Sequence, residues 1–215
     1  MIAATPPMGW NSWNTFGKAI NETLVKQVAD ALVQSGLRDA GYVYVNLDDH
    51  WQCGRDEHGQ PVPYPDKFPG GIKALADYVH QRGLKFGLYS DAGEKTCGGE
   101  VGSFGYEAID ARCYAAWGVD YLKYDYCYAP ADAATAIQHY TTMGKALRAT
   151  GRPIVYSICE WGERQPWLWA AEAGGHLWRT TGDIWDHWEG KRDYALGVMD
   201  IVDLQVGIAD YAGPG

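Results

Sequence analysis

Lys123 and Asp125, two residues apart, could together form a nucleophilic site. In a β-strand, side chains two positions apart project from the same face, so the ammonium and the carboxylate would point together. The positive charge favours the ionised carboxylate, which suits a nucleophile. The alternative is a buried ion pair that only holds the end of a strand, and the spacing leaves both interpretations open.

A second carboxylate, Asp183, lies between Trp178 and Trp185. A carboxyl group that protonates a leaving oxygen at neutral pH needs a raised pKa, which desolvation beside either tryptophan and the charge of another carboxylate would provide. Aspartate is also a preferred helix N-cap, so the capping of a helix that begins at Ile184 is the structural alternative. One residue could serve both purposes.

The adjacent aspartates Asp48 and Asp49 are a third acidic feature. Adjacent strand residues face opposite sides of a sheet, so both can meet one ligand only where the strand breaks into a loop. The following His50, Trp51 and polar run allow such a break. A carboxylate pair in this position can accept hydrogen bonds from vicinal hydroxyl groups. A solvated acidic turn is the alternative.

The aromatic composition is unusual, with 10 Trp and 15 Tyr against 4 Phe. Trp and Tyr combine a flat apolar face with a polar group, and sugars present apolar C–H faces ringed by hydroxyls. An aromatic-rich core would have the same composition. Placement favours sugar binding, because several tryptophans lie in loop-like segments beside carboxylates: Trp13, Trp51, Trp161 and Trp178.

Charge and hydropathy exclude two classes of partner. The chain of 215 residues has 18 Lys and Arg against 27 Asp and Glu, and a net charge of −9 is the wrong sign for binding a phosphate backbone. We therefore expect no nucleic-acid partner. No apolar run approaches the roughly 18 residues of a membrane span, and the N-terminus lacks the pattern of a signal peptide, so we expect no membrane partner.

The cysteines and histidines argue against a metal centre. No Cys-x-x-Cys pair and no His-Glu-x-x-His spacing occurs, so we expect no metal and no other cofactor. With 5 Cys, at least one thiol is unpaired or forms a bridge between chains.

The elements that must position these residues alternate between strand-like and helical runs. A first strand opens into a loop at 8–13, and further strands are predicted at 42–48, 84–89, 119–124, 153–158 and 177–180. Helices are predicted at 21–39, 70–81, 105–117, 130–150 and 166–173, and 52–66 is expected to be a polar loop. Asn21 can cap the first helix, and Pro130 suits the first turn of the fourth.

Strands separated by helices predict a parallel sheet, because each crossover needs a helix to return the chain. An open doubly wound sheet and a (β/α)8 TIM barrel are the candidates. No Gly-x-Gly-x-x-Gly or P-loop occurs, which disfavours the nucleotide-binding versions of the open sheet. Barrel enzymes assemble their sites at the C-terminal ends of the strands. The polar residues lie at these ends: Asp48, Asp49, Tyr89, Asp91, Lys123, Asp125, Glu160, Arg179 and Asp183.

Several short segments occur in a fixed order along the chain. They are 7–13 (PMGWNSW), 47–51 (LDDHW), 68–72 (FPGGI), 87–93 (GLYSDAG) with Thr96 and Cys97, 123–125 (KYD), 159–162 (CEWG) and 178–184 (WRTTGDI). In this order they resemble the successive motifs of glycoside hydrolase family 27, the α-galactosidase/melibiase family. The resemblance covers essentially the whole chain and is very specific for the family.

The resemblance implies a retaining double displacement. Asp125 would attack the anomeric carbon to form a glycosyl-enzyme, and Asp183 would protonate the leaving oxygen and later deprotonate water. Retention needs the two carboxyl groups only about 5 Å apart. The resemblance also implies that a set of side chains holds the galactose ring: Trp13, Asp48, Asp49, Tyr89 and Lys123.

Within that set, the two aspartates would bind the O4 and O6 side of the sugar. Glu160 and Arg179 match positions near the 2-hydroxyl, and the bulky Trp161 leaves little space for an N-acetyl group. A disulfide between Cys97 and Cys127 is implied as well. The remaining cysteines would then be thiols: Cys53, Cys113 and Cys159.

The resemblance also bears on the extent of the domain. Family members continue beyond a segment like 212–215 (AGPG) into two further strands and usually a β domain. We therefore expect 1–215 to be one catalytic barrel domain, truncated after about six βα units and without a C-terminal β domain. An oligomer or a complementing C-terminal segment would complete it. We expect a secreted or periplasmic location, with a cytoplasmic one as the alternative.

The expected activity is release of terminal α-linked galactose from melibiose, raffinose-type oligosaccharides or galactomannan. An inactive or weakly active carbohydrate-binding fragment is one alternative. Another specificity of the family, such as α-N-acetylgalactosaminidase or isomaltodextranase, is the other.

Overall fold

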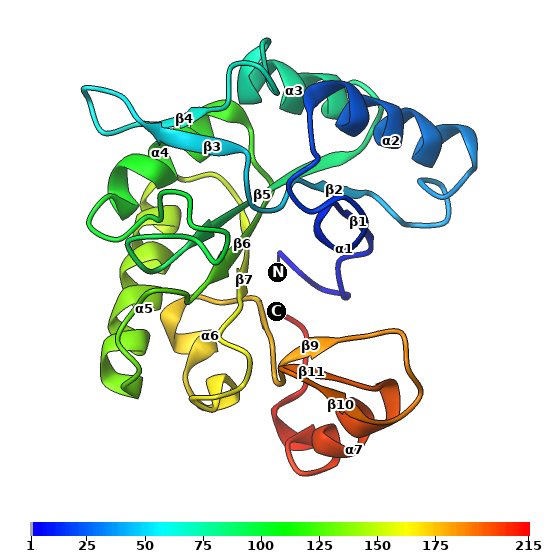
Figure 1. The fold of residues 1–215 in the computed structure, drawn as a ribbon, viewed down its shortest axis with the longest axis vertical. Coiled ribbons are helices and arrows are strands. Elements are labelled where there is room, and N and C mark those ends of the chain that lie inside the picture. The colour runs from blue at the N-terminus through cyan, green and yellow to red at the C-terminus, as the bar shows by residue number, and fades with distance from the viewer. Residues whose placement is uncertain (1) are drawn as a thin grey trace.

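A curved six-stranded parallel sheet forms the centre of the computed structural model, which describes residues 2–215 (Figure 1). The strand order is β1-β2-β5-β6-β7-β8, and every neighbouring pair is parallel. The strands are β1 (Gly9–Asn11), β2 (Tyr44–Asn46), β5 (Lys85–Asp91), β6 (Tyr121–Asp125), β7 (Val155–Ile158) and β8 (Leu177–Trp178). The predicted α/β architecture with a parallel sheet is confirmed, and the sheet is a half-barrel.

Helices connect successive strands across the outside of the half-barrel (Figure 1). They are α2 (Glu22–Gln34), α3 (Gly71–His80), α4 (Glu107–Trp117), α5 (Ala133–Ala149) and the short α6 (Ala170–Ala173), which follows η1 (Pro166–Leu168). Asn21 caps α2 as predicted, since its side chain accepts from the Leu24 N–H at 2.8 Å. The predicted end of that helix is too late, because Gly36 adopts a φ of +81° just beyond Gln34.

The predicted start of the fourth long helix is also wrong. Asp132 is the N-cap of α5 and accepts the Thr135 N–H at 2.8 Å, so the helix begins at Ala133 and Pro130 precedes it. An Asp side chain can accept an exposed N–H of the first turn, and here that contact decides where the helix starts.

Residues 52–66 are not a simple loop, because they contain the antiparallel hairpin β3 (Gln52–Arg55) and β4 (Pro61–Pro63). Proline cannot donate to a strand ladder and is tolerated only at an edge, which is why the composition suggested a loop. Arg55 fixes the hairpin to α4 through two hydrogen bonds to Asp110, of 2.6 and 2.8 Å.

The C-terminal quarter adds small elements that the sequence patterns did not indicate. A three-stranded sheet contains β9 (Asp183–Ile184), β10 (Lys191–Arg192) and β11 (Ala195–Leu196). It is followed by α7 (Val198–Val206) and η2 (Ala209–Tyr211), while α1 (Trp13–Phe16) follows β1 near the other end of the chain. No helix within 2–215 is long and apolar enough to cross a membrane.

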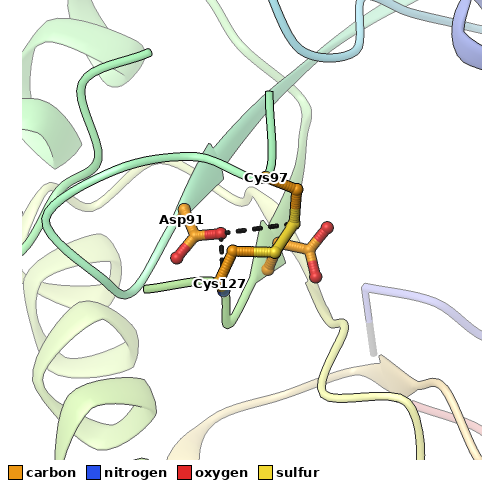
Figure 2. A group of neighbouring side chains, drawn as sticks. Asp91, Cys97 and Cys127 are labelled. Atoms are coloured by element: carbon orange, nitrogen blue, oxygen red, sulfur yellow. Dashed lines mark hydrogen bonds between the residues drawn. A yellow bond between two sulfur atoms is a disulfide. The ribbon is translucent and has the colours of Figure 1, made fainter. Parts of the chain in front are cut away.

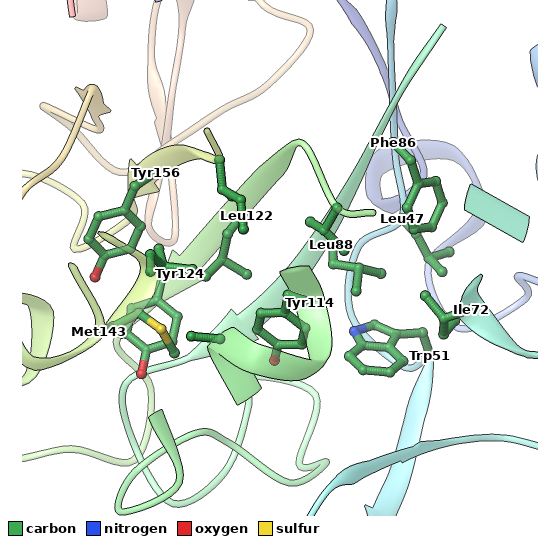
Figure 3. Close-up of a cluster of buried hydrophobic side chains, with 14 of the residues drawn as sticks. Leu47, Trp51, Ile72, Phe86, Leu88, Tyr114, Leu122, Tyr124, Met143 and Tyr156 are labelled. Atoms are coloured by element: carbon green, nitrogen blue, oxygen red, sulfur yellow. The ribbon is translucent and has the colours of Figure 1, made fainter. Parts of the chain in front are cut away.

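Between the sheet and the helices lies a core rich in aromatic side chains (Figure 3). Trp51, expected in a loop beside carboxylates, is fully buried, and its indole N–H donates to the Tyr89 carbonyl at 2.8 Å. Several tyrosines are buried to the same degree: Tyr114, Tyr124, Tyr140 and Tyr156. The core therefore accounts for much of the unusual aromatic composition.

Candidate functional site

The sequence-predicted polar residues gather at the carboxyl edge of the sheet, because parallel strands bring these ends together. Asp48 and Asp49 follow β2, and Glu160 and Arg179 follow β7 and β8. In the β5–β6 ladder, Tyr89 pairs with Lys123 and Asp91 with Asp125.

Asp125 ends β6 as a buried carboxylate. The Tyr89 hydroxyl donates to its Oδ2 at 3.1 Å, and the Tyr126 N–H donates to its Oδ1 at 3.1 Å. Burial raises the pKa of Asp125, and the Lys123 ammonium opposes that rise. Asp125 therefore combines a desolvated position with a nearby positive charge that favours its ionised form.

The ammonium of Lys123 forms its ion pair with Asp48, at 2.9 Å, and not with Asp125. Burial alone would lower the pKa of Lys123, but the negative charges of Asp48 and Asp125 raise it. The ion-pair alternative is therefore right about Lys123 and wrong about its partner, which lies in the segment after β2.

Asp48 and Asp49 are both buried, so the solvated acidic turn is wrong. Asp48 Oδ2 also accepts from the Asn11 amide at 2.8 Å. Asp49 accepts the N–H groups of His50 at 2.7 Å and Gly98 at 2.8 Å. Burial raises the pKa of Asp49, and these two N–H groups oppose the rise. Because β2 ends at Asn46, both aspartates lie beyond the strand, and His50 follows them with a φ of +67°.

His50 is part of a group that sequence reasoning missed. Its ring stacks on Trp13 with centroids 6.1 Å apart, and its Nδ1 lies 2.8 Å from Glu100 Oε1. Tyr64 donates to the same Glu100 oxygen at 2.8 Å. In this group His50 supports the Trp13 indole by stacking on it. The only sequence signal for that contact is that His50 directly follows Asp48 and Asp49.

Glu160 is fully buried after β7. Its Oε2 accepts the Arg164 N–H at 2.8 Å, while Oε1 has no hydrogen-bond partner within the described residues. Burial raises the pKa of Glu160 to about 7, against the opposing effect of Arg164. The neighbouring Trp161 is partly buried and has a φ of +61°.

Asp183 lies in β9 and not at a helix N-terminus, so the N-cap alternative is wrong. Its side chain is 43% exposed and accepts from Arg179 at 3.0 Å. The expected desolvation of Asp183 beside Trp178 or Trp185 is not found, because its side chain is exposed. The Trp185 indole instead stacks on His187, with ring centroids 3.7 Å apart.

Cys159 connects the two catalytic candidates. Its thiol is buried beside Asp125 and lowers the pKa of that carboxyl group. Its sulfur lies 4.0 Å from Arg179 Nη1, and Arg179 also contacts Asp183. The two carboxyl groups thus lie on either side of a Cys159–Arg179 contact.

The disulfide between Cys97 and Cys127 is present, with a Cα–Cα distance of 5.1 Å (Figure 2). Cys53, Cys113 and Cys159 are free thiols, as implied. Asp91 and Asp125 lie close to the two bridge sulfurs. These sulfurs are bonded to each other, so the group offers a metal ion only two carboxylates.

Comparison with known proteins identifies the family. The model of the family described as Alpha galactosidase A (Melibiase_2) matches residues 5–215. The chain belongs to this family. It is similar to Alpha-galactosidase A of Cellvibrio japonicus, with 50% identity over 218 residues, which cover 100% of the chain and 53% of that protein. It is also 54% identical to Alpha-galactosidase 3 of Arabidopsis thaliana, over 100% of the chain and 47% of that protein.

Solved structures agree with this membership. α-Galactosidase I from Mortierella vinacea has a TM-score of 0.94 and 42% identity, covering 99% of this chain and 58% of that one. The Saccharomyces cerevisiae α-galactosidase with raffinose has a TM-score of 0.93 and 37% identity, covering 99% and 51%. The chain spans about half the length of the curated relatives it matches.

Proposed function

We propose that the protein is a retaining glycoside hydrolase that releases terminal α-linked galactose from galactosides such as melibiose, raffinose-type oligosaccharides and galactomannan. The observation that carries the proposal is the buried carboxylate of Asp125, held by Tyr89 at the carboxyl edge of the sheet in a chain of the α-galactosidase family. Relatives named α-galactosidase, one of them solved with raffinose, support this substrate class.

The first chemical step is the attack of Asp125 on the anomeric carbon. An ionised carboxylate is required, and Lys123 and the hydroxyl of Tyr89 both favour that form. The carboxylate forms a covalent bond to the sugar as the bond to the leaving oxygen breaks.

Asp183 supplies the proton for the leaving oxygen and removes a proton from water in the second step. The exposed fraction of its side chain gives water and an incoming alcohol access to the carboxyl group. Arg179 fixes the orientation of this carboxyl group at 3.0 Å. Retention requires that the reacting oxygens of the two aspartates come within about 5 Å of each other.

Sugar recognition is assigned to the buried acceptors around Asp125. Asp48 and Asp49 would bind hydroxyls on the O4 and O6 side, where galactose differs from glucose, with Lys123 and Trp13 beside them. The unpaired oxygen of Glu160 suits a free 2-hydroxyl. Arg179 and Trp161 would flank that position and leave little room for an N-acetyl group.

The domain assignment belongs to the same proposal. Residues 1–215 would form the first part of the catalytic (β/α) barrel, with free sheet edges at β1 and β8. Further strands, from the same chain or a second one, would cover these edges.

Hydrolysis of an aryl α-galactoside tests the proposal, with the matching aryl α-glucoside as control. We expect the phenol to be released from the galactoside only, and Asp125→Asn to lose turnover. NMR should show that the α-anomer of galactose forms first. A protein that binds galactose by calorimetry without turnover would instead be a carbohydrate-binding module. Undiminished hydrolysis by Asp125→Asn would exclude Asp125 as the nucleophile.

A further inference from the structure

Asp91 is a buried carboxylate that the proposed function does not use. It ends β5 and pairs in register with Asp125 at the end of β6. Its Oδ1 accepts the Gly93 N–H at 2.7 Å, and its Oδ2 accepts the Cys127 N–H at 2.9 Å. The side chain is fully buried, and both of its carboxylate oxygens are already occupied by backbone N–H groups. Burying a carboxyl group is costly unless it forms such hydrogen bonds, which points to a specific task.

Asp91 is also part of a closed ring of contacts around Asp125. It holds the N–H of Cys127, and Cys127 is joined by the disulfide to Cys97 (Figure 2). The Cys97 N–H in turn donates to the Tyr89 hydroxyl at 3.5 Å. That hydroxyl donates to Asp125 Oδ2 at 3.1 Å, and Asp125 lies only two residues before Cys127 on the same chain segment.

We propose that Asp91 is a positioning residue for Asp125, acting through the Cys97–Cys127 bridge and the hydroxyl of Tyr89. The inference rests on the proposed role of Asp125 as nucleophile. Tyr89 is itself buried, so its hydroxyl has little freedom apart from the two contacts that the ring provides. Displacing Cys127 would shift Cys97, and with it the hydrogen bond that orients the attacking oxygen.

The substitution Asp91→Asn would break the ring while keeping the shape of the side chain. A carboxylate accepts from both N–H groups, whereas an amide has one acceptor oxygen and presents an N–H₂ to the second donor. Either Gly93 or Cys127 would then lose its acceptor and move.

The charged and titratable groups that face Asp91 and Asp125 come from every neighbouring strand end. They are Asp48 and Asp49 after β2, Tyr89 on β5, Lys123 on β6, Cys159 after β7 and Arg179 after β8. Burial and the charge of Asp125 raise the pKa of Asp91 to about 8. The N–H groups of Gly93 and Cys127 oppose that rise in pKa and favour the carboxylate, which accepts from both of them.

The test compares Asp91→Asn with Asp120→Asn in the purified protein. Asp120, next to the N-terminal end of β6, also holds a backbone N–H, that of Phe86 at 2.8 Å, but lies at the opposite end of the strand. We expect Asp91→Asn to lower kcat on an aryl α-galactoside about 10- to 100-fold with KM within about twofold, because misplacement of a reacting group acts on kcat. Asp120→Asn should leave kcat within about twofold.

A second readout needs no activity. Limited reduction followed by alkylation and mass spectrometry measures how fast the Cys97–Cys127 bridge opens. We expect faster opening in Asp91→Asn than in wild type or Asp120→Asn. If the wild-type protein hydrolyses no α-galactoside, the proposed function fails, but the reduction experiment still tests the ring of contacts. Equal rates of disulfide opening in wild type and Asp91→Asn would overturn the inference.

The variant Cys97→Ser/Cys127→Ser breaks the ring at the disulfide. It provides a second test of the inference if Asp91→Asn does not fold. It should reproduce the loss of kcat at unchanged KM. A kcat close to wild type in either folded variant, or an equal loss in Asp120→Asn, would overturn the positioning role.

Discussion

Replacing Lys123 by methionine tests whether the ion pair with Asp48 organises the floor of the site. Methionine keeps most of the apolar stem but removes the ammonium, which lies 2.9 Å from Asp48 Oδ2. The side chains are only 23% and 3% exposed, so Asp48 would become a buried carboxylate without a counter-charge. Breaking such a pair costs about 3–5 kcal/mol.

The lower end of that range applies, because the Asn11 amide still donates to Asp48 at 2.8 Å. A loss of about 3 kcal/mol corresponds to a fall in Tm of about 6–12 °C for a chain of this size. The matched control is Lys73→Met. Lys73 and Asp77 form an exposed pair, 60% and 47% accessible, whose loss should cost about 0.3–0.5 kcal/mol.

Urea unfolding, followed by tryptophan fluorescence, measures both free energies of unfolding at pH 7. We expect the midpoint of Lys123→Met to fall well below that of Lys73→Met. Equal midpoints for the two variants would contradict a stabilising role for the Lys123–Asp48 pair, since they would mean that water or rearrangement compensates the charge of Asp48 without cost.

Two further predictions concern stability. Burial raises the pKa of Glu160 from 4.5 to about 7, so the folded protein holds this proton longer than the unfolded chain, and stability should fall as the pH rises through that interval. Unfolding measured across this pH range should show a shallower fall in Glu160→Gln than in the exposed control Glu163→Gln, and identical slopes would contradict the assignment. Removing the disulfide in Cys97→Ser/Cys127→Ser opens a loop with a sequence separation of 30 residues and should cost about 3–4 kcal/mol in unfolding free energy. An unchanged Tm would show that the bridge does not restrict the unfolded chain.

The alternation of strands and helices could be predicted from local patterns, because each pattern depends on residues close together in the chain. The same local patterns predicted that three polar residues lie near the ends of strands: Asp48, Lys123 and Arg179. The hairpin at 52–63 could not be predicted, because its proline-rich composition is typical of a loop. Trp51 was misplaced because only its packing shows that it belongs to the core.

The family motifs, their order and the edge of the sheet at which the polar residues meet can be predicted from the amino-acid sequence. Which of these side chains contact one another depends on the fold. Lys123 pairs with Asp48, 75 residues away, and Asp183 pairs with Arg179 on the segment after β8. The physical reason is that local spacing fixes the face on which a side chain projects, whereas its partner depends on strand register and on the loops that close over the strand ends.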